Sequence, residues 1–192
     1  MTPREFLDIL HVAERLKDTP RHCTTTKRRT ESVAEHSWRV SLMALLLKGE
    51  FPDADMDKVV KMCLVHDLGE CFTGDIPTFV KTDADRDVED SLLSRWVRSL
   101  PPEVSGELVE LFREMDAQQT MEAKIYKSLD KLEALIQHNE SPLDTWSENE
   151  YGLNKVYAFD TVAFSGWLTG LRKEILEDTL TKIAGENPDS NP

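Results

Sequence analysis

The sequence predicts an all-α protein, a single helical bundle of about seven helices. Apolar residues recur at helical intervals of three and four along several segments, and the period-two alternation of strands persists nowhere. The 192 residues correspond to about one domain. Apolar and aromatic residues make up 40% of the chain, so it can bury a core without disulfides. Glycine-rich phosphate loops are absent, which excludes the Rossmann and P-loop folds.

A capping box at Thr2 and Glu5 begins the first expected helix. That helix should end near Lys17, because the following Asp-Thr-Pro sequence disfavours its continuation. The next segment, 18–31, is polar and forms a basic island in an acidic chain. Its cationic residues are Arg21, His22, Lys27, Arg28 and Arg29.

A second capping box, at Ser32 and Glu35, begins the second expected helix. One stripe of this helix carries His36, Val40, Met43 and Leu47. A third helix is expected over roughly 56–69, and it places His66 on the same face as two apolar residues. A turn is expected over 73–77, which contains glycine, aspartate and proline.

The second half of the chain predicts four more helices. One lies near 86–99 and another follows the Pro-Pro pair at 101–102. The segment 120–138 carries the strongest amphipathic pattern, with an apolar stripe of Ile125, Leu129, Leu132 and Ile136. Residues 139–158 are expected to form a long loop, and a last helix should run from about 159 to 184. We therefore expect one domain over 1–184 and a disordered tail over 185–192.

The charge balance limits the partners of the protein. Acidic residues number 36 and basic residues 23, so the net charge is −13. Such a charge repels nucleic-acid polymers and anionic membranes, although a small phosphate ligand remains possible. Three cysteines cannot all pair with one another, and no signal peptide is visible. We therefore expect free thiols and a cytoplasmic location. No apolar run approaches the roughly 20 residues that span a bilayer.

The His66-Asp67 dipeptide ends an otherwise apolar helical segment. A buried aspartate costs several kcal/mol unless it is paired or binds a cation. Taken alone, the dipeptide is also typical of a core histidine beside a surface aspartate. His36 alone is equally typical of a hydrogen-bonded core histidine, and Asp130 of a surface acid that pairs with a neighbouring lysine.

Together these four residues place two imidazoles and two carboxylates on three helices. Mixed nitrogen and oxygen ligation suits divalent Mn, Fe, Co, Ni or Zn, with open positions for water or substrate. The order H…HD…D at 36, 66–67 and 130 resembles the HD superfamily of metal-dependent phosphohydrolases.

Longer motifs strengthen the resemblance. Residues 29–37 read RTESVAEHS, which is similar to the RTENVSEHS signature of the bacterial 5′-deoxynucleotidases. Residues 66–70 read HDLGE and residues 73–78 read TGDIPT, which resemble the HDxxE and TGDLPT runs of that family. Residues 127–131, KSLDK, match the context of the last ligand, and eukaryotic HD-domain-containing relatives share these blocks.

The resemblance implies roles for individual residues. It implies that His36, His66, Asp67 and Asp130 bind one divalent metal, with Mg as a further possible ion. Glu70 and Asp75 match two further acids of the active site. Glu70 also lies one helical turn from His66 and Asp67, where a carboxylate can accept a proton from a metal-bound water. Glu70 can also be interpreted as a surface glutamate at a helix end, and Asp75 as an ordinary turn aspartate.

Arg21 and His22 precede the first metal-ligand motif. Arg21 lies at the spacing at which the family has a phosphate-binding arginine, and a guanidinium matches phosphate oxygens. Its other interpretation is a solvated basic loop. His22 departs from the family, which has a tryptophan there that contributes to recognition of deoxyribose. Histidines for a second metal are absent between Asp67 and Asp130, which favours a single metal.

We therefore expect a cytoplasmic, metal-dependent 5′-nucleotidase that hydrolyses nucleoside 5′-monophosphates, preferably deoxy, to nucleoside and phosphate. Family resemblance also implies a homodimer. Two alternatives remain open at this point. One is a catalytically weak nucleotide-binding or scaffold module, and the other is an HD phosphohydrolase that acts on a nucleoside triphosphate or a cyclic dinucleotide.

Overall fold

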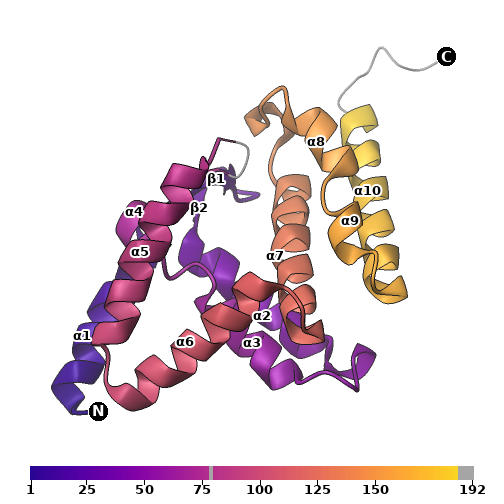
Figure 1. Cartoon of the computed structure of the whole chain (residues 1–192). Helices are drawn as coiled ribbons and strands as arrows, with labels where there is room; N and C mark the ends of the chain where they lie inside the picture. Colours follow the sequence, from indigo (N-terminus) through magenta and orange to yellow (C-terminus); the bar gives the residue numbers. More distant parts are fainter. Residues whose placement is uncertain (78–79, 186–192) are drawn as a thin grey trace.

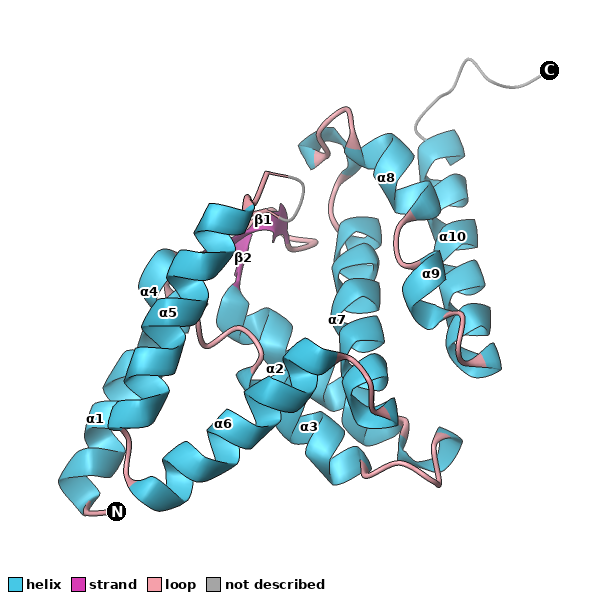
Figure 2. Cartoon of the chain, in the orientation of Figure 1, coloured by secondary structure: helices cyan, strands magenta, loops and turns pink. Residues whose placement is uncertain are grey.

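Helices dominate the computed structural model, which describes residues 1–77 and 80–185 (Figure 1, Figure 2). The longer helices are α1 (Pro3–Ala13), α2 (Val33–Leu46), α3 (Met56–Val65), α5 (Asp83–Ser99), α6 (Pro102–Ala117), α7 (Met121–Glu140) and α10 (Gly166–Gly185). The shorter ones are α4 (Glu70–Thr73), α8 (Glu150–Val156), α9 (Phe159–Val162) and 3-10 turns at Glu14–Lys17, Lys48–Glu50 and Leu143–Thr145. The all-α prediction is confirmed, and each expected helix matches one of the longer helices.

Helix α7 lies at the centre of the core, between α2 and α3 on one side and α10 on the other (Figure 1). Its expected apolar stripe is buried at Ile125, Leu129 and Leu132. Val40 of α2 and Met62 of α3 are buried in the same cluster. This packing brings the segments that carry His36, His66 and Asp130 to a common centre.

Both N-terminal capping boxes form as expected, at Thr2 with Glu5 and at Ser32 with Glu35. Between them the chain forms a small hairpin that the sequence did not predict. Strand β1 (Pro20–Thr24) pairs antiparallel with β2 (Thr30–Ser32). Strands this short and polar offer too few residues to display an alternating pattern. Side chains alternate along β1. Arg21 and Cys23 therefore lie on its more buried side and His22 on its more exposed side.

The expected helix over 56–69 is interrupted. α3 ends at Val65, residues 66–69 form a turn, and α4 follows. A Cβ atom at Gly69 would lie 2.8 Å from Cγ of Glu89, so glycine permits the close approach of α5. Glu89 in turn accepts hydrogen bonds from Thr73 at 3.1 Å and Lys81 at 2.7 Å. Glu89 thereby bonds to residues on both sides of Asp75.

The prediction of a long loop over 139–158 was wrong, because α8 forms there. Its last carbonyl groups are satisfied from a distant helix. The buried Arg172 of α10 donates to the carbonyl oxygens of Asn154 and Tyr157, both at 2.8 Å. A long-range contact of this kind stabilises a helix that local sequence preference does not reveal.

The last expected helix is split into α9 and α10 by a turn at 163–165, where Ser165 Oγ accepts from the backbone N–H of Leu168. α10 includes Gly185, which the sequence analysis assigned to the tail, and the rest of that expected tail, residues 186–192, lies outside the described part of the chain. Among the described helices, none combines the length and apolarity needed to cross a membrane. The three cysteines are free and buried.

Candidate metal centre and nucleotide pocket

Four side chains expected to act together converge at one point. His36 comes from α2, Asp130 from α7, and His66 and Asp67 from the turn after α3. His36 Nε2 lies 3.2 Å from both His66 Nε2 and Asp130 Oδ1. His66 Nε2 lies 3.1 Å from Asp67 Oδ2. The ligand atoms of His36, His66 and Asp67 all lie within 4.8 Å of one another. Asp130 adjoins them through the two imidazoles, while its Oδ2 accepts from Lys127 at 2.8 Å.

The histidine rings are oriented with Nε2 toward this centre. His66 Nδ1 donates to the carbonyl oxygen of Cys63 at 2.8 Å, and His36 Nδ1 donates to Glu133. Two imidazole nitrogens facing each other gain little unless a proton or a cation lies between them. Burial alone lowers the pKa of His66, but Asp67 and Asp130 raise it to about 10. The centre therefore favours positive charge, and its two nitrogens and two carboxylate oxygens fit a divalent cation.

Glu133 supports this centre and was not identified from the sequence. It lies in α7, is fully buried, and accepts from His36 Nδ1 and from Arg39 Nε, the latter at 2.6 Å. Such a carboxylate fixes the tautomer and orientation of a ligand histidine. The available signal was a glutamate next to Leu132 within the strongest apolar stripe, where an unpaired acid is costly.

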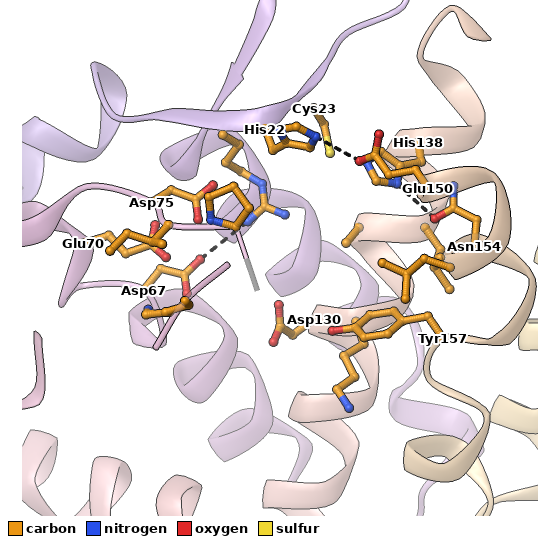
Figure 3. A pocket seen from close by; sticks show the side chains of 18 of the residues that line it. His22, Cys23, Asp67, Glu70, Asp75, Asp130, His138, Glu150, Asn154 and Tyr157 are labelled. Carbon is orange, nitrogen blue, oxygen red and sulfur yellow. Dashed lines mark hydrogen bonds and ion pairs between the residues drawn. The ribbon is translucent and has the colours of Figure 1, made fainter. Parts of the chain in front are cut away.

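Glu70 and Asp75 lie beside Asp67 at the same end of the pocket (Figure 3). Glu70 is 7% exposed, and its Oε2 atom has no hydrogen-bond partner among the described residues. Burial and the nearby carboxylates of Asp67 and Asp75 raise the pKa of Glu70 to about 9. Burial also raises the pKa of Asp75, which follows Gly74 in a loop where φ is +77°. This environment holds a proton on a carboxyl group that faces the cavity.

Arg21 points from β1 toward the same end. Its Nη1 atom lies 4.0 Å from Asp67 Oδ2, and its Nε donates to Glu31 Oε2 at 3.1 Å. Glu31 is buried. It belongs to the RTESVAEHS motif, and the sequence did not indicate that it would hold Arg21. The side chain of Arg21 is only 13% exposed, so the solvated-loop interpretation does not describe it.

The pocket has a volume of about 490 Å³, within the range of small-molecule sites. Asp67, Glu70 and Asp75 lie toward one side, His138, Glu150 and Asn154 toward the other, and His22 and Asp130 between them (Figure 3). Arg21 also lines the pocket. Apolar side chains complete it. They are Ile76, Pro77, Ala134, Leu135, Leu153 and the aromatic Tyr157. Four further cations also line it: Lys81, Arg86, Lys127 and Lys131. Lys127 pairs with Asp130, as one interpretation of that acid expected.

A helical bundle in which an H…HD…D set converges beside a pocket is the arrangement that defines the HD class of proteins. The chain belongs to the HD-domain family, whose model matches residues 13–166.

Similarity to individual proteins supports this assignment. Over 141 residues, the chain is 33% identical to a Bos taurus protein named 5′-deoxynucleotidase HDDC2, covering 71% of this chain and 68% of that protein. A predicted metal-dependent phosphohydrolase from Magnetospirillum magnetotacticum MS-1 superposes with a TM-score of 0.78 at 25% identity, covering 93% of each chain. The cyanophage S-2L HD phosphohydrolase DatZ, bound to dA and one catalytic Zn²⁺, shares the fold with a TM-score of 0.58 at 23% identity, covering 91% of this chain and 96% of that one.

Proposed function

We propose that this protein is a metal-dependent 5′-nucleotidase that hydrolyses nucleoside 5′-monophosphates, with deoxynucleotides among them, to nucleoside and phosphate. The observation that carries the proposal is the convergence of His36, His66, Asp67 and Asp130 at one end of a pocket that Arg21 also lines. Relatives named 5′-deoxynucleotidase, about one third identical, support the substrate class.

One divalent cation is the cofactor in this proposal, with His36, His66, Asp67 and Asp130 as its ligands. The mixed N/O donor set suits Mn, Co, Fe, Ni or Zn, and Mg remains a candidate. A cation bound there supplies Lewis acidity toward the phosphoryl group and lowers the pKa of a bound water.

The surrounding residues bind the phosphate and transfer the proton. Arg21, held by Glu31, binds phosphate oxygens with its guanidinium. Water attacks phosphorus, the bond from phosphorus to the 5′-oxygen breaks, and the 5′-oxygen takes a proton. Glu70 donates this proton, because its raised pKa allows it to hold one near neutral pH, and the proton released by the attacking water returns to Glu70. Asp75 lies next to Glu70 and sustains that pKa.

From Asp67, Glu70 and Asp75 the pocket extends past His22 toward His138 and Glu150 (Figure 3). A nucleotide bound with its phosphate at Arg21 has its sugar and base directed toward this side. His22 stands where the bacterial 5′-deoxynucleotidases have a tryptophan. A histidine can hydrogen-bond a 2′-hydroxyl that a large apolar ring excludes, so we expect ribonucleotides to be accepted as well.

A second substrate class, nucleoside triphosphates, is favoured by the cations Lys81, Arg86, Lys127 and Lys131 that line the pocket. All four already have partners. Lys81 bonds to Glu89 at 2.7 Å, Lys127 to Asp130 at 2.8 Å, Lys131 to Thr161 at 2.7 Å, and Arg86 to the Lys81 carbonyl oxygen at 3.0 Å. We therefore place monophosphates first.

The remaining proposals concern organisation. We propose a single HD domain over 1–184, a homodimer and a cytoplasmic location. Exposed apolar side chains support the homodimer, since Trp38 and Leu45 of α2 are 63% and 54% exposed and lie about two helical turns apart. The free cysteines are consistent with a reducing compartment. Light scattering on the purified protein tests the dimer.

A phosphate-release screen tests the proposed activity. Deoxynucleoside 5′-monophosphates, their 3′-monophosphate isomers, ribonucleotides and triphosphates are compared with Mn²⁺, Co²⁺, Mg²⁺ or a chelator. We expect 5′-monophosphates to exceed 3′-monophosphates and triphosphates by at least about tenfold in kcat/KM, or 1.4 kcal/mol. Comparable values for mono- and triphosphates would contradict the proposed substrate class.

A further inference from the structure

A polar cluster at the wall opposite the phosphate end joins three elements through one carboxylate. Glu150 of α8 is 1% exposed. Its Oε1 atom lies 3.0 Å from His22 Nε2 of β1 and 3.1 Å from His138 Nε2 of α7 (Figure 3). Its Oε2 atom accepts from the backbone N–H of Ser147 at 2.6 Å and from the Ser147 hydroxyl at 2.7 Å. Oε2 is therefore held by two hydrogen bonds, whereas Oε1 has no hydrogen-bond partner among the described residues and lies within ion-pair distance of both imidazoles.

The contacts set the charges in this cluster. An ionised carboxylate only accepts hydrogen bonds, and although burial raises the pKa of Glu150, its contacts with His138 and Ser147 lower it to about 2. The ionised carboxylate therefore faces a charged His138, whose pKa is raised to about 10 by Cys23 and Glu150 despite its burial, and the His22 ring approaches the same oxygen. His138 is fixed a second time, because its Nδ1 donates to Asn154 Oδ1 at 3.1 Å. Glu150 thus links the His22 ring to an anchored part of the helical core.

The cluster lies in the wall of the pocket that contains the candidate metal centre. His22, His138, Glu150 and Asn154 all line the pocket that contains Asp67 and Asp130. The side chain of His22 is 38% exposed, whereas that of Glu150 is 1% exposed. The imidazole is thus the part of this contact that a ligand meets, and the buried carboxylate sets its orientation.

We propose that Glu150 is a positioning residue for sugar recognition, which holds the His22 imidazole against the ribose of a bound nucleoside 5′-monophosphate. This inference rests on the proposed nucleotidase function and extends it beyond the H…HD…D motif to α8. Glu150 acts through His22, and therefore it affects how the sugar is bound rather than the cleavage of the phosphate bond.

The Glu150→Gln variant tests the proposal against the matched control Glu148→Gln, which changes an exposed acid in the same segment. kcat/KM is measured for AMP and dAMP in wild type and in both variants. We expect Glu150→Gln to lower the AMP-to-dAMP ratio of kcat/KM at least about threefold, the effect of one weakened hydrogen bond to the 2′-hydroxyl. We expect this lower ratio to come from a higher KM for AMP, while kcat for dAMP stays within about twofold of wild type. Glu148→Gln should leave the ratio unchanged.

A double-mutant cycle separates positioning from a general structural effect. In a His22→Trp background, Glu150→Gln should leave the sugar ratio unchanged, because the residue through which it acts is absent. The same change in both backgrounds, or no change in either, would overturn the proposal. If Glu150→Gln does not fold, Glu150→Asp replaces it in the same cycle, since Asp keeps the charge but shortens the reach.

An activity-independent measurement keeps this inference distinct from the proposed function. Side-chain ¹⁵N NMR reports the protonation of each imidazole nitrogen. Because His22 Nε2 lies 3.0 Å from Glu150 Oε1, Glu150→Gln should alter the His22 signals while Glu148→Gln does not. Unaltered His22 signals in Glu150→Gln would overturn the inference. Absence of nucleotide hydrolysis by the wild-type protein would instead contradict the proposed function.

Discussion

Replacement of Glu133 by glutamine removes a buried negative charge that joins His36 to Arg39. The volume stays nearly constant, so no cavity forms. The glutamine carbonyl can still accept from one of the two donors, and the other loses its partner. A hydrogen bond to a charged group contributes roughly 1.5–3 kcal/mol, so we expect a loss of about that size in the free energy of unfolding.

The same variant should weaken metal binding. His36 Nδ1 donates to Glu133 and thereby directs Nε2 toward His66 and Asp130. Loss of such a supporting carboxylate typically reduces metal affinity about 10- to 100-fold, or roughly 1.4–2.7 kcal/mol. Titration calorimetry with Mn²⁺ on chelator-treated protein measures the affinity, and urea unfolding in chelator measures the stability.

Glu140→Gln provides the matched control, because Glu140 also bonds to Arg39, at 2.6 Å, but is largely exposed. Exposed pairs contribute about 0–1 kcal/mol, so this variant should stay close to wild type in stability and retain its metal affinity. A metal affinity of Glu133→Gln within about threefold of wild type would refute the supporting role of Glu133.

Three other predictions follow from the pocket. Glu70→Gln should keep its metal but lose turnover by about 10²- to 10⁴-fold, and a kcat near that of wild type would remove Glu70 from the mechanism. His22→Trp should raise the dAMP-over-AMP ratio of kcat/KM, and an unchanged ratio would contradict only the sugar argument. Glu150→Gln should cost more stability near pH 6 than near pH 9.5. Burial lowers the pKa of His138, but contacts with Cys23 and Glu150 outweigh it and raise this pKa from 6.5 to about 10. The charged imidazole therefore stabilises the folded state fully below pH 6.5, and this contribution is lost as the pH rises toward 10. Unfolding in urea at both pH values measures the difference, and an equal loss of stability at the two would contradict the His138–Glu150 pairing.

The long helices and the metal centre were accessible from the sequence for physical reasons. The helix around Leu129 and Leu132 is long and strongly periodic, so local pattern and tertiary packing agree there. The centre was visible because His66 and Asp67 end an apolar helical segment, where polar groups need a partner.

Features that depend on long-range contacts were not accessible. α8 is stabilised by Arg172 from α10, and Glu150 lies within ion-pair distance of His22 and His138. The hairpin that carries Arg21 is too short to show strand periodicity. The sequence also revealed neither Glu133 nor Glu31 as supports, because each is defined only by the group that it contacts in the folded chain.

The most direct test of the account is the metal stoichiometry of wild type and of the His66→Ala/Asp67→Ala double variant. Titration of chelator-treated protein with Mn²⁺ should give about one equivalent for wild type. The double variant removes one nitrogen and one carboxylate ligand from a centre whose imidazole nitrogens lie 3.1–3.7 Å from each other and from the carboxylate oxygens. It should bind no metal in the same concentration range. Undiminished binding by the double variant would contradict the assignment of this centre.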